Sequence, residues 1–328
     1  MNVALLEVSD LEVRFGQQGE QVQALNDVSF SIELGEIVGL VGESGSGKTV
    51  TSLALMGLLD PRDSQVSGTV TLDGVAVLDG SGRRKRNAEL PIAMIFQEPM
   101  TALDPVFTVG SQLVETLRLR QHLSRRAAEA AARELLDAVG IPDPKARMRA
   151  YPHELSGGMR QRVVIAIALA CAPKLLIADE PTTAVDVTIQ AQLLELIRGL
   201  AVDRGMGVLF VTHDLGVVAE TCDRMITMYA GRIVESGPVR EVLDGPAHPY
   251  TAGLLAALPS LERRGEPLVT IPGRVPSPSE HSAGCMFAAR CAFREDICDA
   301  PLALAPYSSS RVVRCARAAD IELAGAAS

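Results

Sequence analysis

A glycine-rich turn between an apolar run and a helical segment constrains this chain more than any other feature. The stretch from Glu36 to Thr51 reads EIVGLVGESGSGKTVT. It contains two glycines with four residues between them, followed by Lys and Thr, which is the pattern of a phosphate-binding loop. The run Ile37 to Val41 predicts a buried strand, and Thr49 to Leu59 predicts a helix. This context favours a phosphate site over a loop that only turns the chain.

The residue types of the loop explain how it would hold a polyphosphate. Glycines let the backbone approach the ligand and point N–H groups at it, and the helix dipole adds partial positive charge. We expect Lys48 to reach the β- and γ-phosphates and the Thr49 hydroxyl to ligate Mg²⁺. The candidate nucleotide-binding residues here are Gly42, Ser44, Gly45, Ser46, Gly47, Lys48 and Thr49.

Composition limits the class of protein. The chain has 328 residues, 47% of them apolar, which is enough for one large α/β domain and a smaller one. The net charge of −9 and the aromatic content of 3% argue against nucleic acid as the main partner. The longest apolar run, Val163 to Ala172, is shorter than a membrane span, and the N-terminus lacks the basic start of a secretion signal. We expect a soluble, cytoplasmic chain whose membrane role requires separate membrane subunits.

Strands alternate with helices up to about Asp244, which predicts a mainly parallel sheet covered on both faces. Beyond that residue prolines are dense, and we expect an irregular appended domain over residues 245–328. The expected strands lie in residues 4–34, 68–78, 92–96, 174–178, 208–212 and 225–235. The expected helices lie in residues 110–140, 156–171, 189–201 and 215–221.

Polar side chains follow the apolar strands at their ends. Asp179 ends a fully apolar strand, where a carboxylate is costly unless Mg²⁺ or another cation pairs with it. Glu180 comes next and is a candidate base that deprotonates or orients water for attack on the γ-phosphate. Gln97 could reach Mg²⁺ or that water, and His213 could bond a phosphate oxygen. Taken singly, Gln97 and His213 are as easily explained as ordinary loop residues.

A glycine pair at the start of an expected helix forms a second candidate anion site. Leu155-Ser156-Gly157-Gly158 precedes the helix, Ser156 is a good N-cap, and the glycines expose backbone N–H groups. Alone, the segment would only be a well-capped helix. The motifs follow one another along the chain in the order phosphate loop, Gln97, Leu155 to Gln161, Asp179-Glu180 and His213. In this order of motifs the chain resembles the ATP-binding cassette (ABC) family of ATPases. The segment from Leu155 to Gln161 matches the signature of that family.

The resemblance implies a head-to-tail dimer of cassettes, with each ATP held between the phosphate loop of one and the signature of the other. Ser156, Gly157 and Gly158 would then bind the partner's ATP. Phe15 falls where the family places the aromatic residue that stacks on the base. Asp186 matches the dimer-contact loop, although Val185 stands where Leu is usual, and Glu98 stands where many relatives have Asp.

The C-terminal part resembles the dipeptide, oligopeptide and nickel importer branch of the family, through residues 248–258 and the segments around Cys285 and Cys291. We therefore expect an ABC domain over residues 1–244, with a helical subdomain at about 101–160. Its fold would be a phosphate-loop α/β core with a mostly parallel sheet, an antiparallel β subdomain and the helical subdomain. Residues 245–328 would form the small irregular domain.

Four cysteines gather near the C-terminus, with five, six and sixteen residues between successive members. A reducing cytoplasm argues against disulfides, and the short CxxC pairs usual in structural zinc sites are absent from this set. Four thiolates suit a [4Fe–4S] cluster, although the spacing is not that of ferredoxins. The branch precedent favours the cluster over zinc, and unliganded thiols are the third possibility. The candidate ligands are Cys285, Cys291, Cys298 and Cys315.

These features predict the ATPase subunit of a bacterial importer of di- or oligopeptides or a related solute, bound to the cytoplasmic face of the membrane. The expected partners are a second, homologous ATPase, two permease subunits and an extracytoplasmic solute-binding protein. A helix of the permeases would enter a groove near Gln97 and residues 98–110. The alternative is a non-transport ABC ATPase that acts on nucleic acid or ribosomes. The sequence does not identify the transported solute.

Overall fold

The computed structural model describes residues 4–16, 21–80, 90–96, 102–181, 187–258 and 270–325. The chain divides into two compact units that interleave along the sequence. The first unit comprises residues 1–5, 33–35 and 87–210, and the second comprises residues 6–32, 36–86 and 211–328. The C-terminal region after Asp244 thus belongs to the same compact unit as the phosphate loop.

The first unit contains buried strands in the order β8-β7-β6. β6 and β7 are parallel, with Ile92 opposite Leu175, and every residue of these strands is buried. Continuous burial explains why the sequence shows unbroken apolar runs here rather than alternation. The elements are β6 (Ile92–Ile95), β7 (Leu175–Asp179), α7 (Val187–Arg204) and β8 (Gly207–Thr212).

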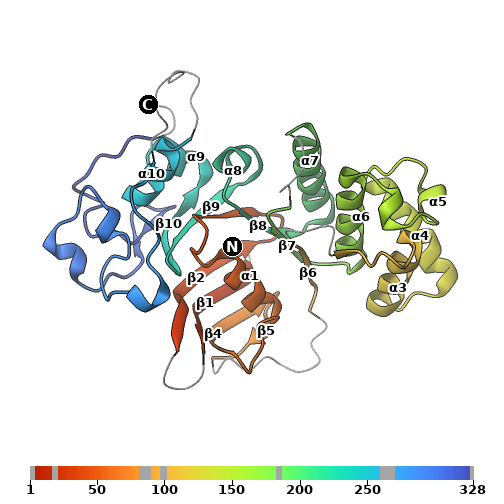
Figure 1. Cartoon of the computed structure of the whole chain (residues 1–328), viewed down its shortest axis with the longest axis horizontal. Coiled ribbons are helices and arrows are strands. Elements are labelled where there is room, and N and C mark those ends of the chain that lie inside the picture. Colours follow the sequence, from red (N-terminus) through yellow and green to blue (C-terminus); the bar gives the residue numbers. More distant parts are fainter. Residues whose placement is uncertain are drawn as a thin grey trace. The chain divides into compact units, whose positions relative to one another are not determined.

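A group of helices completes the first unit, and Figure 1 shows α3, α4, α5 and α6 gathered together. The helical stretch expected at 110–140 is two helices, because His122 takes a left-handed conformation and Ser124 caps a new helix. Short polar side chains cap all four of the α-helices in this group, as their sequences favour. The elements are α3 (Val109–Gln121), α4 (Arg125–Ala138), α5 (Pro144–Arg147), η1 (Pro152–Glu154) and α6 (Gly157–Ala170).

The second unit contains an antiparallel sheet in the order β2-β1-β4-β5. β4 and β5 form a hairpin that turns at Asp73-Gly74, a dipeptide typical of such turns, with φ of 51° and 72° at its two residues. Residues 17–19, where the sequence Gln-Gln-Gly favours another turn, lie outside the described residues. The strands are β1 (Ala4–Phe15), β2 (Val22–Glu33), β4 (Ser64–Leu72) and β5 (Val75–Leu78).

The same unit holds strands in the order β11-β12-β10-β9-β3. β3 runs parallel to β9, whereas β9 and β10 form an antiparallel pair that turns at Gly231. Helix α8 has the predicted bounds. The elements are β3 (Ile37–Val41), α1 (Lys48–Met56), α8 (Leu215–Thr221), β9 (Arg224–Tyr229), β10 (Arg232–Pro238) and α9 (Val239–Asp244).

The C-terminal region is largely irregular, as expected, but it is joined to the rest of its unit by a strand pairing that the sequence did not indicate. Glu235 of β10 lies opposite Val313 of β12. Tyr250 and Phe287 pack with Tyr229 of β9 in one buried cluster. The elements are α10 (Pro249–Ala256), η2 (Pro278–Glu280), η3 (Ala288–Arg290), η4 (Asp296–Asp299), β11 (Ala305–Pro306) and β12 (Val312–Val313).

A buried carboxylate ties this region to β10. Glu235 is fully buried and accepts hydrogen bonds from the backbone N–H groups of Ala247 (2.8 Å) and His248 (3.1 Å). It also forms an ion pair of 2.5 Å with Arg311, whose side chain is only 9% exposed. Because a buried charge is costly without partners, these contacts make Glu235 a structural anchor for the C-terminal region.

We predict that Glu235→Ala lowers the free energy of unfolding by about 3–5 kcal/mol, because it leaves the Arg311 guanidinium buried without its carboxylate. Denaturant unfolding of the full chain measures the change. The matched control is Glu129→Ala, which removes an exposed helical pair with Arg125 and should change the free energy by less than about 1 kcal/mol. Equal losses in the two variants would contradict the anchoring role.

Candidate functional site

The phosphate loop has backbone conformations that require glycine. Gly42, Gly45 and Gly47 have φ of 154°, 80° and 105°. A Cβ atom at Gly42 would lie 2.3 Å from the carbonyl oxygen of Met228, and one at Gly47 would lie 2.7 Å from Leu25 Cδ2. The glycines therefore serve both the turn itself and its close packing on neighbouring strands.

Helix α1 begins directly at the end of this loop, with Gly47 at its N-cap position and no side-chain cap. The N-terminus of a helix carries partial positive charge, which suits an anionic ligand. Ser44, Gly45 and Thr49 are exposed, whereas Ser46 is buried. The Lys48 amine donates to the carbonyl oxygens of Gly42 (2.6 Å) and Glu43 (3.1 Å), which places its positive charge beside the loop. This geometry agrees with that of an anion-binding loop, while the nucleotide-binding roles of its residues stay predictions.

Two more predicted residues belong to the unit that contains the phosphate loop. Phe15 is half-buried at the end of β1, where it pairs with Ser64. His213 is exposed directly after β8. Asp214 beside it caps α8 by accepting from the N–H groups of Gly216 and Val217. Their positions at strand ends agree with the sequence analysis, while their roles stay predictions.

The first unit contains the two predicted acidic residues. Asp179 is the last residue of β7 and is 4% exposed. Glu180 has φ of 46°. Residues other than glycine seldom adopt this backbone conformation, and the exceptions are concentrated at functional sites. The chain thus turns sharply at Glu180, immediately after the buried strand. The Gln161 side chain of α6 donates to the carbonyl oxygen of Pro181 (2.5 Å), the residue after Glu180.

The signature segment forms the start of helix α6, as predicted. Ser156 is the N-cap, and its hydroxyl accepts from the N–H of Met159 (3.3 Å). Ser156 and Gly157 are exposed and Gly158 is half-buried. A Cβ atom at Gly158 would lie 3.2 Å from Ile189, so the second glycine also serves packing. Gln97, Glu98, Val185 and Asp186 lie outside the described residues, and their predicted roles remain predictions.

The four C-terminal cysteines line one small cavity, together with Phe287 and His248. Its volume is about 10 Å³, roughly the space of one water molecule. Burial raises the pKa of the Cys285 thiol to about 11 and also raises the pKa values of Cys291 and Cys315. Within the described ranges, no three His, Cys, Asp or Glu side chains are arranged to hold a single metal ion. The fold gathers the thiols but does not preform a mononuclear site.

The sequence gives no sign of a contact that the structure shows between the C-terminal region and the phosphate loop. The Tyr250 hydroxyl accepts from the N–H of Glu43 (2.7 Å), and Arg290 forms two hydrogen bonds with the Glu43 carboxylate. Glu43 and Arg290 are 247 residues apart in the sequence. No local pattern could have indicated this contact.

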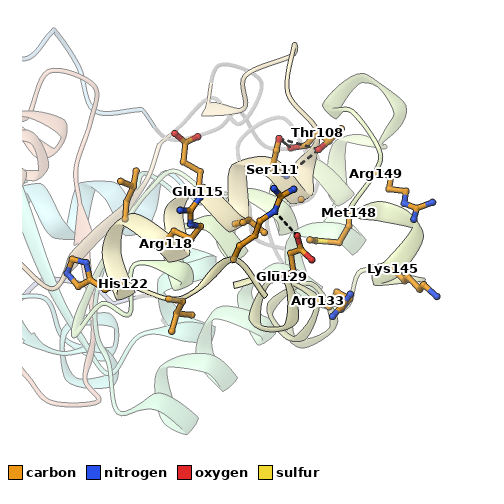
Figure 2. Close-up of a pocket in the computed structure, with 15 residues that line it drawn as sticks. Thr108, Ser111, Glu115, Arg118, His122, Glu129, Arg133, Lys145, Met148 and Arg149 are labelled. Atoms are coloured by element: carbon orange, nitrogen blue, oxygen red, sulfur yellow. Dashed lines mark hydrogen bonds and ion pairs between the residues drawn. The ribbon is translucent and has the colours of Figure 1, made fainter. Parts of the chain in front are cut away.

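A groove of about 1020 Å³ opens on the helical part of the first unit (Figure 2). It lies among α3, α4 and the end of α5, and Arg125 pairs with Glu129 at its edge. Basic side chains outnumber acidic ones in its lining, although the chain as a whole is acidic. The basic residues are Arg118, Arg125, Arg133, Lys145 and Arg149.

Among the described helices, none is both long and apolar enough to cross a membrane.

Two family models match the chain. The model described as ABC transporter matches residues 25–183, which include the phosphate loop and the signature. The model described as oligopeptide/dipeptide transporter, C-terminal region, matches residues 234–298. The second match covers Tyr250, Arg290 and three of the four clustered cysteines.

Similar proteins extend the match to nearly the whole chain. A protein of Brucella melitensis biotype 1, provisionally named as a peptide import ATP-binding protein, is 51% identical over 97% of this chain and 98% of its own length. A Brucella abortus protein with the same provisional name is 49% identical over 95% of this chain and 94% of its own length.

Solved ABC cassettes share the fold. The dimeric structure of MJ0796, a bacterial ABC transporter cassette, matches with a TM-score of 0.60 and 28% identity over 72% of this chain and 99% of that one. CbiO1 of Clostridium perfringens, part of the transporter complex cbiONQ, matches with a TM-score of 0.62 and 26% identity over 74% of this chain and 91% of that one. The chain therefore belongs to the ABC transporter family, as an ATPase of the oligopeptide and dipeptide importer type.

Proposed function

We propose that this protein binds and hydrolyses ATP to drive import of di- or oligopeptides or a related solute through separate permease subunits. The observation that carries the proposal is the phosphate loop, whose glycines have positive φ values that other residues seldom adopt and whose lysine lies beside the start of a helix. The matched C-terminal region supports the peptide importer class and argues against the alternative of a nucleic-acid or ribosome ATPase.

Within this proposal, the phosphate loop cradles the β- and γ-phosphates through its N–H groups and Lys48. The exposed Thr49 hydroxyl, the Asp179 carboxylate and Gln97 are oxygen donors of the kind that Mg²⁺ prefers. When bound, Mg²⁺ neutralises charge on the phosphates. Glu180 deprotonates or orients the attacking water, His213 bonds a phosphate oxygen, and Phe15 stacks on the base.

One chain offers two separate anion sites, the phosphate loop and the start of α6. This favours a head-to-tail dimer in which Ser156, Gly157 and Gly158 complete the site of a second, homologous ATPase. A dimeric arrangement is known for the MJ0796 cassette, which supports the proposal by analogy. The isolated chain would then hydrolyse ATP slowly, because each nucleotide needs residues from two subunits.

The ATPase would work at the cytoplasmic face of the membrane with two permeases, and a solute-binding protein would deliver the solute. The lining of the basic groove of α3, α4 and α5 includes Thr108 and Gly110, which belong to the residues 98–110 near which a permease helix is expected to enter. Its position favours this part of the first unit as the permease contact.

We also propose that Cys285, Cys291, Cys298 and Cys315 hold a [4Fe–4S] cluster with a structural role. The donor set fits, since four thiols line one cavity. When bound, the cluster would cross-link four irregular segments, while the thiols supply its ligands as thiolates.

We predict that Glu180→Gln lowers ATP hydrolysis at least about 100-fold and leaves ATP binding intact, because only the base is lost. Phosphate release by the assembled transporter and equilibrium ATP binding measure the two effects. Glu195→Gln, on the exposed face of α7, is the control and should retain activity. Unchanged turnover in Glu180→Gln would refute the assigned role.

We predict that Ser156→Asp weakens ATP-dependent association of the two ATPases at least about tenfold. Asp is as good an N-cap as Ser, so α6 should persist while the added carboxylate repels phosphate. Association is measured by sedimentation of the two subunits in the presence of ATP. Both subunits carry Gln in place of the catalytic Glu, which is Glu180 in this chain. Ser124→Asp makes the same change at the N-cap of α4 and should leave association unchanged. Equal behaviour of the two variants would exclude the signature as an ATP site.

We predict that anaerobically purified protein contains about four iron atoms and absorbs in the thiolate-to-iron charge-transfer region, as a [4Fe–4S] cluster requires. Cys298→Ser should lower the iron content and the absorbance together. Cys222→Ser, at a buried cysteine outside the set, is the control and should retain both. A colourless preparation with stoichiometric zinc would overturn the cluster assignment.

A further inference from the structure

The C-terminal region holds the first residues of the phosphate loop through Glu43. Arg290 Nη1 lies 2.6 Å from one Glu43 carboxylate oxygen, and Nη2 lies 3.1 Å from the other. The Tyr250 hydroxyl accepts from the Glu43 N–H at 2.7 Å. One residue of the loop thus has both its side chain and its backbone amide fixed by residues that lie more than 200 positions away.

Arg290 is itself rigidly placed. Its side chain is 6% exposed, and it also donates to the carbonyl oxygens of Pro272 (2.7 Å) and Ile271 (3.2 Å). The guanidinium carbon lies 5.8 Å from the ring centre of Tyr229 and 5.9 Å from that of Phe287. Because a buried bidentate pair with further hydrogen bonds has little freedom, Arg290 fixes the carboxylate rather than following it.

The charge of Glu43 makes this contact relevant to nucleotide binding. A carboxylate directly after Gly42 stands beside a loop that must accept a polyphosphate, and the two negative charges repel. Arg290 neutralises the carboxylate and turns it toward the C-terminal region. The Arg290 guanidinium stays charged at any physiological pH, as arginine side chains do in proteins. The Tyr250 hydroxyl meanwhile fixes the peptide plane at the start of the loop.

We propose that Arg290 and Tyr250 are positioning residues of the nucleotide site, through which the C-terminal region sets the affinity of the phosphate loop for ATP. The inference rests on the proposed role of that loop. Arg290 acts by cancelling the Glu43 charge, and Tyr250 acts by holding the Glu43 amide. Neither residue is proposed to touch the nucleotide.

The test is equilibrium titration of the full chain with ATP, ADP and AMP. Arg290→Gln should raise the Kd for ATP about tenfold, the Kd for ADP less and that for AMP least, because the repulsion grows with phosphate charge. Glu43→Gln added to Arg290→Gln should restore the Kd for ATP to within about twofold of wild type, since the repelling charge is gone. Tyr250→Phe should raise the Kd for ATP about threefold, the effect of one lost hydrogen bond.

The rescue separates charge cancellation from simple structural support. If the double variant binds ATP as weakly as Arg290→Gln, or if all three nucleotides weaken equally, the proposal is wrong. Arg294→Gln, which removes an exposed pair with Asp299 in the same region, should bind like wild type. If Arg290→Gln does not fold, an unchanged Kd in Tyr250→Phe would itself overturn the proposal. Lys48→Ala tests the phosphate-loop assignment independently of Arg290 and Tyr250. If this variant binds ATP as wild type does, the assignment itself is refuted.

Discussion

The close packing of the phosphate loop on the turn between β9 and β10 is the constraint on which the nucleotide site depends. The N–H of Gly231 donates to the carbonyl oxygen of Ser46 (2.9 Å), and Gly231 in turn accepts from the N–H of Asn26 (2.9 Å). The carbonyl oxygen of Met228 leaves no room for a side chain at Gly42. The loop is therefore shaped by neighbouring strands as much as by its own glycines.

The C-terminal region is part of the same compact unit, and its packing gives it a direct connection with the loop. Arg290 and Cys291 are adjacent at the end of η3, so one short turn carries both the Glu43 contact and a cysteine of the cluster cavity. Tyr229, Tyr250 and Phe287 enclose this junction in an aromatic cluster, with ring centres 4.6–5.4 Å apart. The C-terminal region, which is typical of peptide importers, thus supports the phosphate loop, which is common to all ABC ATPases.

Much of the fold was predictable because its signals are local. Unbroken apolar runs identified β3, β7 and β8, and Ser156 identified the start of α6, since both depend on residues close together in sequence. The break at His122 was missed because nothing in its neighbours requires a left-handed residue there. The two-residue strand β12 was missed because it is too short to show any periodicity.

The sequence by itself determined the family, the phosphate loop, the signature helix and the acidic residues that end β7. Each of these is a pattern of neighbouring residues whose chemistry is fixed by the chain's local geometry. Only the tertiary structure decided that the four cysteines share a cavity, that Glu235 is buried with Arg311, and that Arg290 and Tyr250 hold Glu43. These contacts join residues far apart in sequence, and their partners are chosen by packing, which a local pattern does not encode.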